Sequence, residues 1–193
     1  MEGEKIIYAI YTLFFLILVG SIVLTPLLAF DNDVNSIYKA FSYTCHQKLS
    51  RTLCVFKDVE SLWIADCTPQ TGDYTPGFDE RREITVEMDG AIGYKMPVCS
   101  RDWGLYAAML LGTLVYPIVR EIKERKMLPP ILLVIAIMPL AVDGGLQLIS
   151  EMGFLPFIYE STNAIRLFTG IVAGFAASLY AIPTLINMFT KNR

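Results

Sequence analysis

Apolar residues are concentrated in four runs, and each run is long enough to cross a lipid bilayer. Residues 6–30 contain no charged side chain, and residues 99–119, 127–149 and 165–189 are apolar apart from Asp143 and polar groups near their ends. A membrane-spanning helix needs about 20 such residues. The pattern predicts four transmembrane helices. The first is expected to be retained, because a signal-peptide core is shorter (about 7–15 residues) and precedes a small-residue cleavage site.

Three polar segments separate these runs: an outer loop at 31–98, an inner loop at 120–126 and an outer loop at 150–164. Within the long loop, residues 36–51 have helical periodicity, which would place Cys45 and His46 near the end of a short helix.

A second pattern in the long loop is typical of a β-hairpin. Residues 83–88 and 91–98 are strand-like, and Asp89 and Gly90 lie between them. The hairpin would lead to Cys99 at the start of the second transmembrane helix. The predicted fold is therefore an all-α membrane protein, with one domain over 1–193 and an outer loop that contains a short helix and a β-hairpin.

The distribution of Lys and Arg orients the helices, because basic residues near helix ends collect on the cytoplasmic side. Those that indicate the inner side are Lys5, Arg120, Lys123, Arg125, Lys126, Lys191 and Arg193. We expect a multi-pass protein of the cell membrane, with both termini in the cytoplasm and the long loop outside.

The composition adds few constraints on partners. The chain is 54% hydrophobic and its net charge of −3 does not suggest a nucleic-acid partner. The expected partner is the lipid bilayer, and the sequence does not identify protein partners.

With this topology, polar clusters from four segments fall on the outer side. Their members are Cys45, His46, Gln47 and Arg51 in the loop, Cys99, Arg101 and Asp102 at the second helix, Asp143 and Gln147 in the third, and Glu160, Asn163 and Arg166 at the fourth. We predict Gln47, Arg51, Arg101, Gln147, Asn163 and Arg166 as residues that bind an anionic substrate.

Asp143 lies about six residues, or roughly 9 Å, inside the outer end of its helix. A charge at that depth is costly unless it is paired, so it indicates a functional site. Asp143 or Glu160 is the expected acid/base or supporting group. The alternative is a structural ion pair between Asp143 and Arg166 or Arg101.

Cys45, His46, Cys99 and Asp102 offer thiolate, imidazole and carboxylate groups, all of which zinc accepts, so a zinc or other divalent metal site is one hypothesis. A Cys45–Cys99 disulfide is an alternative in an oxidising compartment. A reactive thiol with His46 as its base is a third.

Cys54 and Cys67 enclose a short loop and are expected to form a stabilising disulfide. Closing a loop of this length stabilises a fold by about 3 kcal/mol.

The order of motifs resembles a family of small prokaryotic integral membrane proteins of unknown function. The tripeptide CHQ at 45–47 is followed by Arg51, and residues 93–106 read GYKMPVCSRDWGLY. The family pattern is CHQ, then R, then GYxxPxCxRxxGxY. The segments 143–147 and 160–166 are similar too. The resemblance implies a fold and a membrane location, and it implies no activity.

Asp102 departs from the family, in which many members carry cysteine at this position. Aspartate can replace cysteine as a metal ligand but not in disulfide exchange, so the departure favours metal binding. Residues 52–82 lie outside the resemblance, and Cys54 and Cys67 belong to that part.

The sequence leaves three functions open. The first is a metal site at the outer membrane face, used for metal-assisted hydrolysis or group transfer on a lipid-linked or anionic substrate. The second is a thiol–disulfide oxidoreductase that passes electrons to a membrane quinone, which the missing CxxC motif disfavours. The third is a transporter or a structural subunit without catalytic activity.

Overall fold

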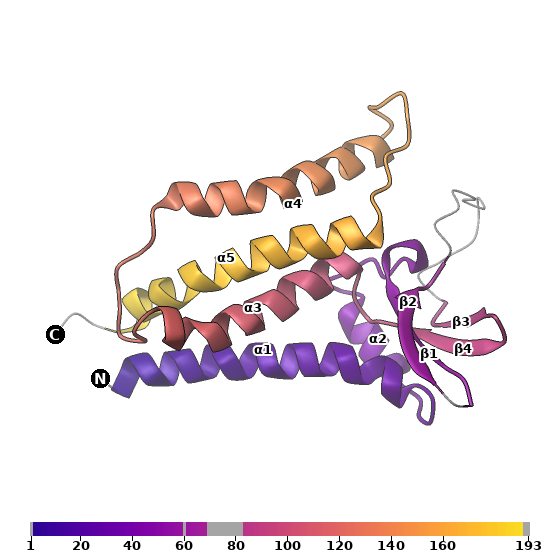
Figure 1. The fold of residues 1–193 in the computed structure, drawn as a ribbon, viewed down its shortest axis with the longest axis horizontal. Helices are drawn as coiled ribbons and strands as arrows, with labels where there is room; N and C mark the ends of the chain where they lie inside the picture. Colours follow the sequence, from indigo (N-terminus) through magenta and orange to yellow (C-terminus); the bar gives the residue numbers. More distant parts are fainter. Residues whose placement is uncertain (1, 60, 69–82, 191–193) are drawn as a thin grey trace.

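The computed structural model describes residues 2–59, 61–68 and 83–190. Four long helices lie side by side: α1 (Glu2–Leu28), α3 (Ser100–Val119), α4 (Pro130–Glu151) and α5 (Asn163–Phe189). A short helix and a small sheet gather at one end, which we call the sheet end, and the start of α1 and the end of α5 lie at the other (Figure 1). Lys191 and Arg193, which enter the orientation argument, lie outside the described residues.

All four long helices are apolar and long enough to cross a membrane, with spans of 26, 20, 22 and 27 residues. This confirms the prediction of four long apolar helices. Helix α1 begins at Glu2, ahead of the apolar run. The helix starts earlier than the predicted span at residue 6, because helical hydrogen bonding continues into polar residues. The apolar run marks only the part of the helix suited to lipid.

Helices α3 and α5 form the tightest pair, and glycines make their close approach possible. A Cβ atom on Gly170 would lie 2.2 Å from the carbonyl oxygen of Arg101, and one on Gly174 would lie 2.2 Å from that of Leu105. Small residues at such positions let helix backbones touch in lipid. This contact fixes the start of α3 against the start of α5.

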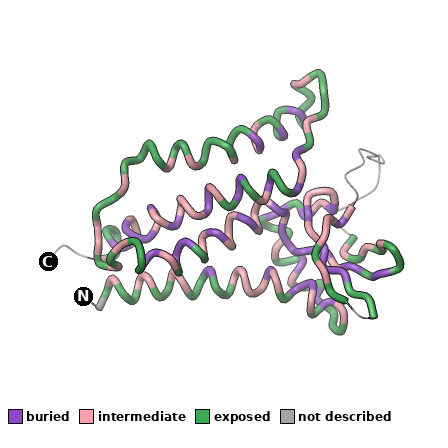
Figure 2. The backbone as a smooth tube through the Cα atoms, viewed as in Figure 1, coloured by how far each residue is buried: buried purple, intermediate pink, exposed green. Residues whose placement is uncertain are grey.

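Helix α4 packs against α5 on its other side and is otherwise largely exposed, as the green tube in Figure 2 shows. Buried residues are concentrated between α3 and α5 and at the sheet end (Figure 2). The helices therefore form a layer in which α4 is the least enclosed member.

The long loop holds a four-stranded antiparallel sheet with the strand order β2-β1-β4-β3. The strands are β1 (Leu53–Lys57), β2 (Leu62–Asp66), β3 (Thr85–Met88) and β4 (Ala91–Lys95). The predicted hairpin is present as β3 and β4, and Asp89 and Gly90 take the positive φ angles of its turn. The term all-α is thus too narrow, because β1 and β2 add a second hairpin that periodicity did not predict.

Cys54 and Cys67 are joined by a disulfide, as the sequence predicts. Both cysteines are buried against Leu49 and Phe56, and Trp63 packs onto the same cluster. The bond ties β1 to the residue that follows β2, so it stabilises the part of the sheet nearest the helices.

The predicted helix over 36–51 is wrong in its extent. Helix α2 covers Asn35–Phe41, and a single 3-10 turn covers Leu49–Arg51. Between them, the hydroxyls of Ser42 and Thr44 donate to the carbonyls of Lys39 and Phe41. Such local bonds compete with helix continuation. The segment that contains Cys45 therefore has no regular secondary structure and lies beyond the end of the helix.

Candidate functional site

Two free cysteines and one carboxylate lie together at the sheet end. Cys99 immediately precedes α3, Asp102 lies in the first turn of that helix, and Cys45 lies in the irregular segment after α2. Their ligand atoms all lie within 4.8 Å of one another. We call these three residues the thiol group. The structure thus brings together three of the four residues that sequence reasoning assigned to a metal.

Main-chain and side-chain bonds fix Cys45 beside Cys99. The backbone N–H of Cys99 donates to Cys45 Sγ at 3.1 Å. The side-chain amide of Gln47 donates to the carbonyls of Tyr38 and Pro97, both at 2.8 Å. Gln47 therefore attaches its segment to the chain entering α3, and it uses its amide hydrogens for this rather than for a substrate.

Lys95 strengthens the same attachment. Its side chain is fully buried, and Nζ donates to the carbonyl oxygen of Gln47 at 2.9 Å. The hydroxyl of Tyr38 in turn donates to the carbonyl of Lys95. A buried ammonium held in this way keeps the residues beside Cys45 in one position.

The two thiols influence each other electrostatically. The Cys99 thiol donates a hydrogen bond toward Cys45, which lowers the pKa of Cys45 despite its burial. The same interaction, together with burial and the Asp102 charge, raises the pKa of Cys99. Cys45 is thus the thiol that is favoured as thiolate, the form that binds metals and attacks electrophiles.

His46 does not join the thiol group. It is exposed, whereas its neighbours Cys45 and Gln47 are buried. The backbone changes direction here, since Gln47 takes a positive φ of 52°, and this segment buries the residues on either side of the histidine. The helical pattern expected from the sequence did not predict this change of direction.

A second group of polar residues joins the sheet to α4 and α5. Arg51 donates through Nε to Glu160 at 2.8 Å and also pairs with Glu151. Arg166, which is 1% exposed, also pairs with Glu160. Burial opposes the charge of Arg51, but its bonds to the two glutamates outweigh this effect and raise its pKa. We call these residues the ionic group. It also includes Asp66, Arg101, Asp143, Gln147, Tyr159, Ser161 and Asn163.

Asp143 belongs to the ionic group. It is 4% exposed and pairs with Arg101, one of the two partners that the sequence suggested. Tyr159 and Ser161 donate to it at 3.0 and 3.3 Å, and Arg101 also donates to Gln147 at 3.1 Å. Since Arg101 lies in the first turn of α3 and Ser161 precedes α5, Asp143 bonds to residues near the starts of both helices.

Asn163 connects the ionic group to the sheet. Its amide donates to the carboxylate of Asp66 at 3.0 Å, and its oxygen accepts from Arg166 at 3.3 Å. Sequence reasoning missed Asp66, Glu151, Tyr159 and Ser161. Only Glu151 carried a signal, because it continues the i, i+4 spacing of Asp143 and Gln147 along the same helix face.

The two groups lie on different faces of α3. Cys99, Trp103 and Tyr106 pack with Ile22 of α1 and with Cys45. The backbone at Arg101 instead contacts α5 at Gly170. Asp143 and Glu160 thus bond within the ionic group. The sequence predicted that they would lie beside the thiol group, and the structure does not bring them there.

Comparison with known proteins supports a membrane protein and assigns no activity. Residues 91–180 match the sequence model of a family described as a predicted membrane protein (DUF2085). The chain is 28% identical over 192 residues to an uncharacterised protein (MJ1492) of Methanocaldococcus jannaschii, which covers 95% of this chain and 96% of that protein. No solved structure matches the chain. These matches support the resemblance to a membrane protein family, and the motif signature stays a prediction.

Proposed function

We propose that the chain is an integral membrane protein that binds zinc, or a similar divalent metal, through Cys45, Cys99 and Asp102. One observation carries this proposal: two free thiols and a carboxylate lie within 4.8 Å, although 54 positions separate the cysteines. The chain forms this group by attaching the Cys45 segment to the start of α3. The nearby disulfide uses the other two cysteines.

The donor set fits zinc chemically. Ligand atoms around tetrahedral zinc, with bonds of about 2.0–2.3 Å, lie roughly 3.3–3.8 Å apart, so the group needs only a small contraction. Thiolates favour zinc over magnesium or calcium, which prefer oxygen ligands. Three protein ligands leave one tetrahedral position for water or a substrate, as in catalytic zinc sites.

The surroundings of the thiol group favour a bound ion with an external ligand. Cys45 packs among Ile22, Val98 and Trp103, which lowers the local dielectric constant and strengthens charge interactions. The indole Nε1–H of Trp103 is buried and has no acceptor among the described residues. It is a suitable donor to a water or substrate that occupies the fourth position.

We place the thiol group on the outer side of the cell membrane, with both termini in the cytoplasm. Basic residues gather at the opposite end of the helices, where Arg125 pairs with Glu4 and Arg120 with Glu124. The disulfide at the sheet end favours an oxidising compartment.

The reaction class that such a site supports is metal-assisted hydrolysis or group transfer, in which the ion would lower the pKa of a bound water. The geometry favours a structural role for Asp143 and Glu160, because both are engaged by arginines.

Elemental analysis of the purified full chain tests the metal site. We expect about one zinc ion per chain, and a loss of roughly tenfold or more in Cys45→Ser, Cys99→Ser and Asp102→Ala. Asp31→Ala, at an exposed carboxylate after α1, is the control and should keep the metal. Wild-type protein free of stoichiometric metal would remove the proposal. A comparable loss in His46→Ala would restore the histidine as a ligand.

The contact between the two free thiols also favours a second function, thiol–disulfide exchange. Here Cys45 and Cys99 would cycle between the dithiol and a disulfide, with a membrane quinone as electron acceptor. Alkylation separates the two cases. A metal would protect both thiols until a chelator is added, whereas a disulfide would protect them until a reductant is added.

A further inference from the structure

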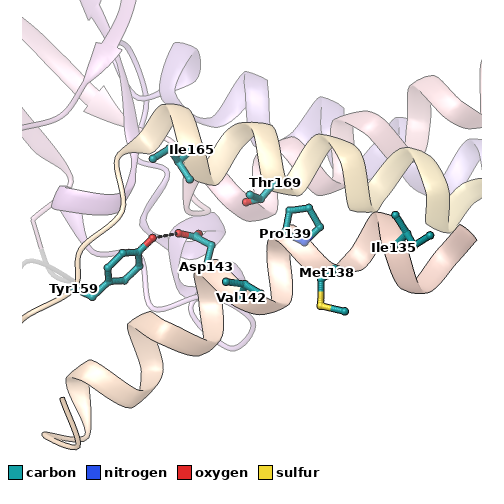
Figure 3. Close-up of a pocket in the computed structure, with 8 residues that line it drawn as sticks. All are labelled: Ile135, Met138, Pro139, Val142, Asp143, Tyr159, Ile165 and Thr169. Atoms are coloured by element: carbon teal, nitrogen blue, oxygen red, sulfur yellow. Dashed lines mark hydrogen bonds between the residues drawn. The ribbon is translucent and has the colours of Figure 1, made fainter. Parts of the chain in front are cut away.

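A cavity of about 480 Å³ lies between α4 and α5. Figure 3 shows the side chains around it, from α4, α5 and the connection between them. They are Ile135, Met138, Pro139, Val142, Asp143, Tyr159, Ile165 and Thr169. Neither the thiol group nor the proposed metal accounts for this cavity.

The cavity is apolar along its length and polar at one end. Along α4 it runs from Ile135 to Asp143, eight residues that correspond to about 12 Å. This is slightly less than half of the roughly 30 Å hydrocarbon core of a bilayer. Its length therefore suits the part of a lipid chain that one leaflet contributes.

The apolar lining opens outward rather than into the protein. Ile135, Val142 and Ile165 are 61%, 51% and 46% exposed. In the membrane orientation proposed above, on which this inference rests, these side chains face hydrocarbon. A lipid chain, rather than water, is then the medium that fills the cavity.

The polar end has hydrogen-bonding capacity to spare. Asp143 Oδ2 accepts from Arg101 and Ser161, whereas Oδ1 accepts only from Tyr159 among the described residues (Figure 3). A carboxylate oxygen can accept two hydrogen bonds. Asp143 is also the only charged residue that lines the cavity among the described residues. Although Arg101 pairs with Oδ2, the remaining acceptor position on Oδ1 therefore suits a further hydrogen-bond donor at the end of the cavity.

We propose that this cavity binds one phospholipid with a primary ammonium head group. One hydrocarbon chain lies between α4 and α5, and the ammonium donates to Asp143 Oδ1. A hydrogen bond between charged partners is stronger than a neutral one, so the head group adds selectivity to the apolar contact.

Native mass spectrometry of the purified, delipidated full chain tests the site. Phosphatidylethanolamine and phosphatidylcholine with identical chains are added separately, because the choline head group has no N–H donor. We expect one ethanolamine lipid to bind about tenfold more tightly than the choline lipid, the difference that a charged hydrogen bond of roughly 1.5 kcal/mol gives.

A matched pair of variants locates the lipid. Val142→Trp fills the cavity, whereas Val134→Trp lies on the same helix, is equally exposed at 51% and does not line it. We expect Val142→Trp to weaken ethanolamine-lipid binding by about tenfold and Val134→Trp to leave it unchanged.

Three results would overturn the proposal: equal binding by the two variants, equal binding of the two lipids, or occupation by a different molecule such as an isoprenoid or a second copy of the chain. Zinc content is measured on the same samples. If the metal is retained while lipid binding fails, only the lipid site is lost. Absence of the protein from membranes would remove the basis of both proposals.

Discussion

At the residue scale, the position of the thiol group depends on a residue outside it. Gln47 takes a φ of 52° and is buried, with its amide bonded to the carbonyls of Tyr38 and Pro97. Few residues other than glycine adopt such an angle without compensation. The two hydrogen bonds offset this strain, and they bring Cys45 to Cys99.

Replacing Gln47 should therefore loosen the thiol group without removing a ligand. We expect Gln47→Ala and Gln47→Met each to destabilise the protein by about 1–3 kcal/mol, because the Pro97 carbonyl loses its side-chain donor and the Tyr38 carbonyl keeps only the backbone N–H of Ser42. Both variants should also lose part of their zinc. Unfolding in detergent and elemental analysis give the two readouts.

Asn32→Ala is the control for this change, since its amide bonds the carbonyl of Leu28 in an exposed position. It should cost less than about 1 kcal/mol. A Gln47→Met protein as stable as the wild type would show that the hydrogen bonds do not hold the segment.

At the scale of elements, the close contact between α3 and α5 decides which groups meet. Gly170 and Gly174 let the backbone of α3 approach, and this places Arg101 toward α4 while Cys99 and Asp102 remain on the α1 side. One helix thereby supplies residues to two separate polar groups. Rotating α3 by a fraction of a turn would disconnect both.

Enlarging Gly170 tests this dependence. In Gly170→Ala the added Cβ would lie 2.2 Å from the carbonyl oxygen of Arg101, so the helices must separate. We expect a destabilisation of about 1–3 kcal/mol, as for overpacked cores, and a weaker contact between Arg101 and Asp143.

Gly145→Ala is the matched control, because nothing lies within 4 Å of its added Cβ. It should stabilise α4 by up to about 1 kcal/mol through helix propensity. Thermal unfolding followed by the helical circular-dichroism signal measures both variants. Equal midpoints would argue against a tight α3–α5 contact.

At the scale of the whole molecule, the helices and the sheet are joined at one end by the ionic group. Arg51 reaches Glu151 and Glu160, and Asn163 reaches Asp66. The opposite end carries the basic turn between α3 and α4. This polarity along the helix axis is the basis for orienting the chain in a membrane.

Labelling with a membrane-impermeant maleimide tests that orientation in intact cells. Glu87→Cys lies on an exposed position of β3, and the Lys123 side chain at the other end is 71% exposed. With the native thiols removed by Cys45→Ser and Cys99→Ser in both proteins, we expect the first variant to react from outside and Lys123→Cys to react only after lysis. The reverse pattern would invert the proposed topology.

The sequence by itself determined the four long helices, the β3–β4 turn and the disulfide between Cys54 and Cys67. These features are local: an apolar run has the length a bilayer requires, Asp89 and Gly90 suit the hairpin turn, and two nearby cysteines close a short loop. It also indicated most members of the polar groups, because charges within apolar helices are conspicuous.

Only the tertiary structure decided how those residues are shared between sites. Helix rotation and contacts between residues 40 or more positions apart pair Arg101 with Asp143 and separate the thiol group from the ionic group. The exposure of His46 also depends on them. Periodicity along one segment carries no information about helix rotation or about contacts between distant residues. The physical reason is that a side chain's partner is set by the packing of whole elements, which local spacing does not determine.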